Sequence, residues 1–416
     1  MSHRYGYMRC GLIGEKLGHS FSPMIHEKLA DYSYDLVELC ADEVEAFVKN
    51  TELDAYNVTI PYKKTVMPLL DVISPEAQAI GAVNTVVRRD GRLYGYNTDY
   101  FGFCHMLDKS GICIKGKKVL VLGTGGAAVT VCAVLGDRQA AEIVSVSFEN
   151  NTPEFLAKHT DVDILINATP VGMYPKNGIS PVDLSLFPKC QGVLDVIYNP
   201  SKTKLLLDAE EIGIPYINGL PMLVAQAVKA FEFFTGDTAD EGTCERITAE
   251  IESQTKNIIL IGMPGCGKST VGRLLASMLG RPFHDADDIF TKTYEITPAQ
   301  VIMNEGEQTF REMEHRIAKE LGKLSGTVIS CGGGVITQDR NYNVLHQNGT
   351  IIFLERDLDK LSKKGRPLSQ SRPIEELYES RISAYKRFAD ITVKSTEVQS
   401  KTAKLMIERL GIRKEK

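Results

Sequence analysis

The sequence predicts an α/β fold with parallel sheets, because strand-like and helix-like patterns alternate along nearly all of its 416 residues. Two further observations favour this class. Apolar strand patterns run directly into glycine-rich loops within residues 117–128 and 258–269, and a helix pattern follows each loop. Units of this kind present backbone amides at a helix N-terminus, where they can bind phosphate groups.

Composition narrows the possible functions. The chain is 43% hydrophobic and 24% charged, which is ordinary for a globular protein of two or three domains. A net charge of −5 with only short charge runs argues against a nucleic-acid surface, so small molecules are the expected substrates. No apolar run reaches the roughly 18 residues of a membrane span and no signal sequence opens the chain, so we expect a cytoplasmic protein without membrane contact. Nine cysteines without a CxxC pair predict reduced thiols rather than a zinc site.

The clearest break in the strand and helix patterns is the polar segment 236–243. We therefore predict two halves. The predicted domains are a substrate domain at 1–103 with 219–236 packing back onto it, a Rossmann dinucleotide-binding domain at 104–218, a linker at 237–256, and a P-loop NTPase-type, nucleoside monophosphate kinase-like α/β domain at 257–416.

The first polar cluster, 18–23, opens a helix pattern in which Ile25 and Leu29 are one turn apart. Ser22 before Pro23 has the form of a helix N-cap, which would explain Ser22 structurally. Ser20 has no such explanation. Two hydroxyls beside free amides at a helix N-terminus also suit a carboxylate ligand.

Three more polar clusters follow, at 57–64, 81–85 and 95–99. Each alone could be a turn in which Asn and Asp side chains bond their own backbone. Gln226 carries a separate signal, because helical spacing places it on an apolar stripe, where its amide must find a partner. A packed core could supply that partner as well as a ligand could.

The glycine loop within 117–128 reads GTGGAA after an apolar strand and has no Lys-Ser ending. This form suits a dinucleotide pyrophosphate better than a triphosphate with Mg²⁺. Taken alone, the motif could equally be a tight structural turn.

Together, these features make the chain from about residue 10 to residue 236 resemble shikimate dehydrogenase. The matching stretches, in order, are GHSFSP, NVTIPYK, GAVNT, YNTD, GTGGAA, NATPVGM, DVIYNP and GLPMLVAQ. The resemblance implies a substrate domain joined to a Rossmann domain, with NADP as the cofactor.

The resemblance also implies that Lys63 and Asp99 form the catalytic pair. Reducing a ring ketone needs hydride on carbon and a proton on oxygen, and the Lys63 ammonium could donate that proton while Asp99 keeps it charged. The other implied residues are the substrate-binding set Ser20, Ser22, Thr59, Asn84, Tyr198 and Gln226, and the cofactor-binding set Gly123, Gly125, Gly126, Ala127 and Gly219.

The second strand of the Rossmann domain departs from the family pattern. The strand at 143–147 runs into Phe148 and Glu149, without the usual arginine for the 2′-phosphate of NADP, and Val129 replaces the arginine often found in the glycine loop. An acidic residue near this position normally binds an unphosphorylated ribose. NAD is therefore an open alternative to NADP.

The stretch 262–269 has the form GxxxxGK[ST] between an apolar strand and a helix. The backbone amides from Gly265 to Ser269 would surround a phosphate chain, so we predict a nucleoside triphosphate site. Asp285 and Asp287 follow at the end of the next strand, where alternate residues share one face and could serve Mg²⁺ and a second substrate. Surface acids are the alternative. Three successive glycines, 332–334, cost so much backbone entropy that we expect another group to approach them closely.

Residues 257–394 resemble shikimate kinase. The resemblance implies that Arg311 and Arg381 clamp the carboxylate of shikimate and that Asp287 accepts the hydroxyl proton. It further implies Gly333 and Gly334 as shikimate ligands, Gly265, Cys266, Gly267, Lys268, Ser269 and Thr270 as ATP ligands, Ser269 and Asp285 in the Mg²⁺ shell, and Arg366 as a catalytic lid residue. The lid looks short, so Lys363 or Lys364 could substitute for its adenine contacts.

Because the product of the first enzyme is the substrate of the second, we predict a bifunctional enzyme of aromatic amino-acid biosynthesis. It would reduce 3-dehydroshikimate to shikimate with NAD(P)H and then phosphorylate the 3-hydroxyl with ATP and Mg²⁺. One alternative is a quinate or shikimate dehydrogenase using NAD, fused to the kinase. The other is a chain in which one half is a non-catalytic scaffold.

Overall fold

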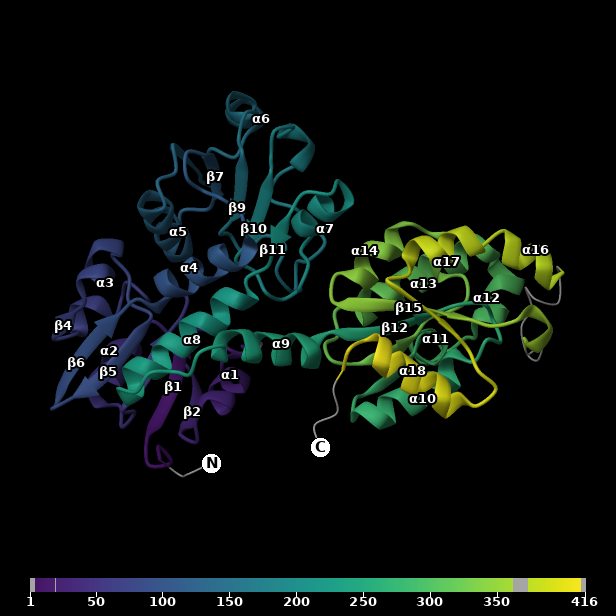
Figure 1. The fold of residues 1–416 in the computed structure, drawn as a ribbon, viewed down its shortest axis with the longest axis horizontal. Helices are drawn as coiled ribbons and strands as arrows, with labels where there is room; N and C mark the ends of the chain where they lie inside the picture. Colours follow the sequence, from purple (N-terminus) through teal and green to yellow (C-terminus); the bar gives the residue numbers. More distant parts are fainter. Residues whose placement is uncertain (1–3, 19, 362–372, 413–416) are drawn as a thin grey trace. The chain divides into compact units, whose positions relative to one another are not determined.

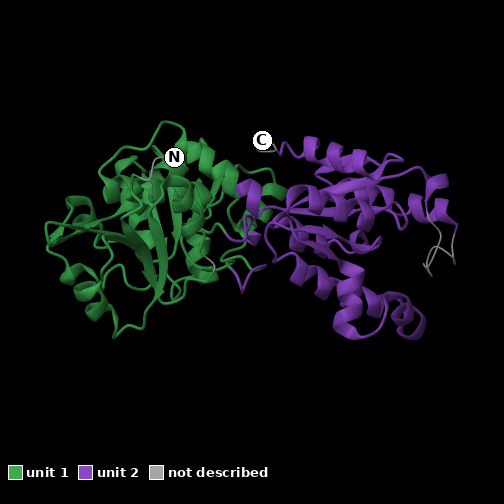
Figure 2. Cartoon of the chain, turned by 90° about the horizontal axis from the view of Figure 1, so that it is seen from below, with its two compact units in different colours: residues 1–173, 179–198, 205–251 green, residues 174–178, 199–204, 252–416 purple. Residues whose placement is uncertain are grey.

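The computed structural model (Figure 1) describes residues 4–18, 20–361 and 373–412. They form two compact units (Figure 2): residues 1–173, 179–198 and 205–251 make the first, and residues 174–178, 199–204 and 252–416 make the second. Helix α9 (Thr243–Thr255) occupies most of the segment predicted as a linker. The predicted domain limits stay predictions.

The first unit begins with a six-stranded sheet in the order β2-β1-β3-β5-β6-β4. Strands β1, β2 and β3 are parallel, whereas β5 pairs antiparallel with β3 and with β6. A two-residue hairpin at Asp90 and Gly91 joins β5 to β6, and its φ angles of 50° and 75° suit the right-handed twist of the strands. The elements are β1 (Arg9–Gly14), α1 (Ser22–Leu29), β2 (Ser33–Glu38), α2 (Val44–Asn50), β3 (Ala55–Val58), β4 (Val72–Ile73), α3 (Pro75–Ile80), β5 (Thr85–Arg89) and β6 (Arg92–Tyr96).

The second sheet of this unit is entirely parallel, in the order β11-β10-β9-β7-β8. Its central strand, β9, is buried along its whole length, as a strand covered on both faces must be. The strand order reverses at β7, and ligands of such sheets bind beyond the carboxyl ends of the strands at that point. The elements are β7 (Lys118–Leu122), α5 (Gly126–Asp137), β8 (Glu142–Val146), α6 (Pro153–Leu156), β9 (Ile164–Asn167), β10 (Gly192–Asp195), α7 (Lys204–Glu211) and β11 (Tyr216–Ile217).

Two long helices of the first unit, α4 (Thr98–Ser110) and α8 (Leu220–Thr235), pack closely side by side (Figure 1). Gly102 permits the approach, because a Cβ there would lie 2.6 Å from the Met222 carbonyl oxygen. The close contact brings the start of α4 beside Gln226 in the middle of α8.

The second unit is built on a parallel sheet in the order β13-β14-β12-β15-β16. Every residue of β12 is buried, and its carboxyl end runs into the predicted phosphate loop. The elements are β12 (Asn257–Ile261), α10 (Lys268–Leu279), β13 (Phe283–Asp285), α11 (Ala286–Tyr294), α12 (Pro298–Glu305), α13 (Glu307–Leu321), β14 (Val328–Ser330), α14 (Arg340–His346), β15 (Gly349–Glu355), α16 (Ile374–Glu379), α17 (Ile382–Phe388), β16 (Ile391–Lys394) and α18 (Gln399–Arg409).

The predicted α/β class is confirmed, with the mixed first sheet as the one departure from parallel pairing. Among the described helices, none combines the length and apolar character needed to cross a membrane.

Candidate active sites

The start of α1 holds the two serines of the first polar cluster. The helix begins at Ser22, Phe21 is its N-cap residue, and no side chain caps it. The interpretation of Ser22 as an N-cap is therefore wrong. Instead the Ser22 N–H donates to Ser20 Oγ at 3.2 Å, so both hydroxyls lie at the positive end of the helix dipole. The Tyr198 ring packs on Phe21 with centroids 5.1 Å apart, which adds Tyr198 to this group.

Lys63 and Asp99 form an ion pair in which Nζ lies 2.5 Å from Oδ2. Their side chains are only 18% and 10% exposed, so water screens the pair weakly. Asp99 lies in the first turn of α4, which Asn97 caps by accepting from the Tyr100 N–H. The Lys63 side chain lies 3.9 Å from the position that a Cβ of Gly126 would take. The ion pair is therefore beside the glycine loop.

The amides of Asn84 and Gln226 meet at Thr98. Asn84 Nδ2 donates to Thr98 Oγ1 at 3.0 Å, and that hydroxyl lies 3.4 Å from Gln226 Oε1. Gln226 Nε2 donates to the Leu223 carbonyl at 2.8 Å, so the buried amide has partners within the protein. Thr59 lies at the turn that follows β3, where its backbone N–H donates to the Ile13 carbonyl.

The loop after β7 contains one closely packed glycine and one glycine whose backbone is uncovered. Gly123 has φ of +112°, which favours glycine, and a Cβ there would lie 2.9 Å from the Ala168 carbonyl oxygen. Gly125 is the N-cap residue of α5, and a Cβ on it would meet no other atom within 4 Å. Ala127 lies in the first turn of that helix. Gly219 is required by packing, because a Cβ there would overlap the Val196 carbonyl.

In the second unit, the loop between β12 and α10 has positive φ at Gly262, Gly265 and Gly267. Lys268 is 9% exposed, and its ammonium donates to the Gly262 and Met263 carbonyls at 2.9 and 3.2 Å. Cys266 is buried, whereas Thr270 is exposed. The loop therefore surrounds its own lysine, as a phosphate-binding loop does.

Asp285 and Asp287 do not alternate along one strand. Strand β13 ends at Asp285, which caps α11 by accepting from the Asp287 N–H, so Asp287 lies in a helical turn. The predicted strand geometry is wrong, because the N-cap side chain starts the helix earlier than the pattern indicated. Asp285 pairs in register with Ser330, and Ser269 Oγ lies 3.4 Å from Ser330 Oγ. No group of three or more His, Cys, Asp and Glu side chains among the described residues could hold a metal ion.

The three glycines at 332–334 do lie against other groups, as predicted. A Cβ at Gly332 would lie 2.5 Å from Glu314 Oε1 and 3.2 Å from Asp287 Oδ1. A Cβ at Gly333 would lie 2.7 Å from Pro264 in the phosphate loop, and one at Gly334 would overlap the Arg311 guanidinium. The glycines therefore bring the acids, the arginine and the phosphate loop to one place.

Arg311 and Glu314 form a buried pair on α13. Arg311 Nη1 lies 2.7 Å from Glu314 Oε2, Nη2 lies 2.8 Å from Glu307 Oε1, and Nε is buried without a protein partner. Arg381 donates to the Gly333 carbonyl at 3.3 Å. Burial raises the pKa of Glu314, Asp287 raises it further, and the Arg311 charge opposes both. The charge of Arg381 also lowers the pKa of Glu314.

Comparison with known proteins identifies the first unit. Residues 12–86 match the family model of the shikimate dehydrogenase substrate binding domain, and residues 219–246 match that of the shikimate 5′-dehydrogenase C-terminal domain. The shikimate dehydrogenase (NADP(+)) of Clostridium perfringens (strain SM101 / Type A) is 42% identical over 266 residues, which cover 58% of this chain and 97% of that protein. The chain belongs to the shikimate dehydrogenase family.

Solved structures agree with this assignment. A chorismate mutase/shikimate 5-dehydrogenase fusion protein from Clostridium acetobutylicum matches with a TM-score of 0.55 and 39% identity, over 59% of this chain and 97% of that chain. Shikimate 5-dehydrogenase from Listeria monocytogenes, solved with shikimate and NAD, matches with a TM-score of 0.51 and 31% identity. The match covers 60% of this chain and 99% of that chain.

The remaining part of the chain matches a second family. Residues 264–411 match the family model of shikimate kinase. The chain is thus a bifunctional shikimate-pathway enzyme, a shikimate dehydrogenase followed by a shikimate kinase.

The dehydrogenase half has an uncharged side chain where β8 ends. Phe148 is 95% exposed. A hydrogen bond from the Ser147 side chain, with help from the backbone, lowers the pKa of Glu149, so this acid is ionised at neutral pH. Ser147 N–H donates to Asn150 Oδ1 at 2.6 Å, which closes the turn.

Sequence reasoning missed Glu314 and Thr98. Glu314 had a signal, since it lies three residues after Arg311 on one helix, at the spacing of an ion pair. Thr98 had no such signal in the sequence, because a threonine beside an aspartate at the start of a helix is typical of ordinary helix capping. Arg366, Lys363 and Lys364 lie outside the described residues.

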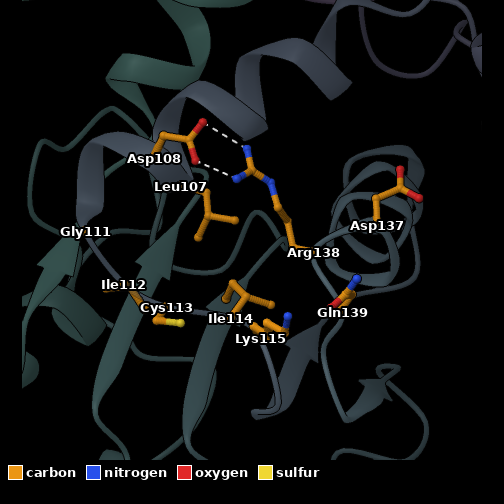
Figure 3. Close-up of a pocket in the computed structure, with 10 residues that line it drawn as sticks. All are labelled: Leu107, Asp108, Gly111, Ile112, Cys113, Ile114, Lys115, Asp137, Arg138 and Gln139. Atoms are coloured by element: carbon orange, nitrogen blue, oxygen red, sulfur yellow. Dashed lines mark hydrogen bonds and ion pairs between the residues drawn. The ribbon is translucent and has the colours of Figure 1, made fainter.

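Two hollows in the surface contain none of the predicted residues. One, of about 440 Å³, lies between the ends of α4 and α5 and is bounded by the ion pair of Asp108 and Arg138, with nitrogen and oxygen 2.9 Å apart (Figure 3). The other, of about 510 Å³, is lined by Arg356, Asp357, Lys360, Lys394, Ser395, Thr396, Glu397 and Leu405. Arg356 approaches the phosphate loop, since its Nη1 lies 3.7 Å from the position of a Cβ on Gly267.

Proposed function

We propose that the first unit reduces 3-dehydroshikimate to shikimate with NADPH, and that the second unit transfers a phosphoryl group from ATP to the 3-hydroxyl. The observation that carries the first step is the Lys63–Asp99 ion pair beside the glycine loop. The NADP(+) in the names of the relatives supports the cofactor, although Phe148 and Glu149 favour some use of NAD as well.

In the dehydrogenase step, a bound reduced nicotinamide supplies a hydride to the carbonyl carbon. The Lys63 ammonium donates a proton to the carbonyl oxygen as the alcohol forms, and solvent then reprotonates the amine. Asp99 holds the ammonium in place through the 2.5 Å contact between Nζ and Oδ2. Ser20 and Ser22 would hold the carboxylate, while Thr59, Asn84, Tyr198 and Gln226 would surround the ring.

In the kinase step, placement and neutralisation of charge do most of the work. Arg311 and Arg381 would bind the carboxylate of shikimate and Asp287 would accept the hydroxyl proton, while Lys268 would contact the transferred phosphoryl group. Gly265 to Thr270 would surround the phosphates, and the hollow beside Arg356 would receive the base of ATP.

The residues present fit a magnesium ion. Ser269 and Asp285 offer a hydroxyl and a carboxylate on either side of Ser330, and Mg²⁺ prefers oxygen ligands of this kind while keeping several waters. Magnesium bound with ATP would neutralise phosphate charge. We further propose that the enzyme works in the cytoplasm, which its nine free cysteines support.

Replacing Lys63 with Ala tests the dehydrogenase assignment. Dehydrogenase kcat should fall by about 10² or more, since general acid catalysis contributes that much, while kinase activity in the same preparation should be unchanged. Near-normal reduction of 3-dehydroshikimate by this variant would overturn the assignment.

A further inference from the structure

Thr98 is the centre of a buried polar group in the first unit. It is fully buried, and Asn84 and Gln226, the two amides proposed to bind ring hydroxyls, lie on either side of its hydroxyl. Thr85 completes the group, with its hydroxyl 3.1 Å from Asn84 Oδ1 and 3.2 Å from Thr98 Oγ1. The direction of each hydrogen bond can be deduced, because backbone groups fix the ends of the network.

The Asn84 amide has only one possible orientation. A backbone N–H can only donate, and the Thr98 N–H lies 2.7 Å from Asn84 Oδ1, so the oxygen must face it. The Thr85 hydroxyl, which accepts from Asn57 Nδ2 at 3.1 Å, donates to the same oxygen. These two donors use both lone pairs of Asn84 Oδ1. Asn84 Nδ2 therefore turns towards Thr98 Oγ1 and donates to it.

The same reasoning fixes Gln226 from the other side. The Thr98 hydroxyl hydrogen has three oxygens within reach, those of Asn84, Thr85 and Gln226. Two donors already occupy Asn84 Oδ1. Gln226 Oε1 can only accept a hydrogen bond, so its contact with Thr98 requires the Thr98 hydroxyl to donate to it. The Leu223 carbonyl can only accept, and Gln226 Nε2 lies 2.8 Å from it. Both ends of the Gln226 amide thus require the same orientation.

We infer that Thr98 is a positioning residue whose hydroxyl links the amides of Asn84 and Gln226 and holds them in these orientations, and thereby controls the pattern of hydroxyls that the dehydrogenase site accepts. The inference rests on the proposed function, in which these amides bind ring hydroxyls. Asn84 then presents its second N–H as a donor, and Gln226 presents a second lone pair as an acceptor. A substrate without the matching hydroxyl leaves one of these groups unpaired, which is how a polar site rejects analogues.

The test is Thr98→Val, which keeps the shape and the backbone N–H but removes the hydroxyl. We expect the KM for shikimate to rise about tenfold, the loss of roughly one to two neutral hydrogen bonds, with the KM for NADP⁺ unchanged within twofold. Thr98→Ser should restore the KM to within about twofold of the wild type. The same comparison is made with 4-deoxyshikimate and 5-deoxyshikimate as substrates. For the analogue that lacks the hydroxyl bound by these amides, Thr98→Val should leave the KM unchanged.

Tyr56→Phe is the matched control, because it also removes a buried hydroxyl, one that makes no hydrogen bond. Its KM should equal that of the wild type. Melting temperatures of all variants check folding, and Thr98→Ala replaces Thr98→Val if the latter does not fold. An unchanged KM in Thr98→Val, or an equal increase against shikimate and both analogues, would overturn the inference. Inactivity of the wild type on shikimate would instead overturn the proposed function, so the two failures are distinguishable.

Discussion

At the scale of single residues, the two proposed sites share one arrangement, a largely buried cation that pairs with carboxylates. Lys63 has one such partner and Arg311 has two. A buried charge without a partner is costly, so each pair constrains its cation in a fixed direction before a substrate arrives.

Arg311→Ala should therefore have two effects. The KM for shikimate should rise at least about tenfold with little change in the KM for ATP, because a charge-assisted pair with the carboxylate is lost. Stability should fall by about 3 kcal/mol, because Glu314 stays buried without its partner. Steady-state kinetics and urea unfolding measure the two effects.

The double variant Arg311→Ala with Glu314→Gln separates these effects. It should recover much of the stability but none of the shikimate affinity. A single variant with weakened ATP binding and normal shikimate binding would place Arg311 on the nucleotide side.

His26 should make the first unit sensitive to acid. Burial lowers the pKa of His26 from 6.5 to about 3, and its ring stacks on Tyr34 with centroids 3.8 Å apart. The folded pKa is below the unfolded one, so its stabilising effect is complete above pH 6.5 and is lost as the pH falls towards 3. Between pH 7 and pH 5 this loss should be about 2 kcal/mol.

Calorimetry of the wild type and of His26→Gln at both pH values measures this contribution. The variant should show a smaller decrease in the melting temperature of the first unit between pH 7 and pH 5. Parallel decreases in both proteins would show that other groups cause the acid sensitivity.

At the scale of elements, the end of β8 is the clearest departure from the family. An exposed Phe148 offers no charge to a 2′-phosphate, and an ionised Glu149 repels one. We therefore expect a smaller preference for NADP over NAD than the names of the relatives imply, or a reversed one.

Phe148→Arg should shift the kcat/KM ratio towards NADP by a contact worth at most about 1.5–3 kcal/mol. Phe148→Leu serves as the uncharged control and should leave the ratio unchanged. If the wild type already prefers NADP strongly, another cation such as Lys158 reaches the phosphate, and this interpretation of β8 is wrong.

Strand ends also show where sequence patterns mislead. The alternation expected for Asp285 and Asp287 fails because a strand residue can act as the N-cap of the next helix, and the backbone then turns at once. The glycines at 332–334 were easier to interpret, because the entropic cost of three glycines requires a compensating close contact, whichever group makes it.

At the scale of the whole molecule, each unit has cores of its own. One cluster of buried apolar residues lies entirely within the second unit, and the others lie within the first. Separate cores give separate stabilities, so damage in one active site should leave the other intact.

Lys268→Ala tests this independence. Kinase turnover should nearly vanish, because the transferred phosphoryl group loses its cation, while dehydrogenase rates should stay within about twofold. The two activities are measured on one preparation. A collapse of the dehydrogenase rate would show that the units depend on each other.

The sequence by itself determined the fold class, the two glycine loops and the pairing of a dehydrogenase with a kinase. These features are local, since a strand, a loop and a helix lie next to one another in the chain, and motifs such as NVTIPYK and GxxxxGK[ST] keep their chemistry within a few residues. Residue types at fixed spacing therefore sufficed.

Only the tertiary structure decided which groups share a site. Thr98 and Gln226 are distant in sequence and meet because α4 packs on α8, and Glu314 meets Asp287 across Gly332. Such contacts depend on packing between elements, and the direction of an amide depends on the backbone groups at both of its ends. No spacing along one chain contains that information, because it arises only when separate segments fold against each other.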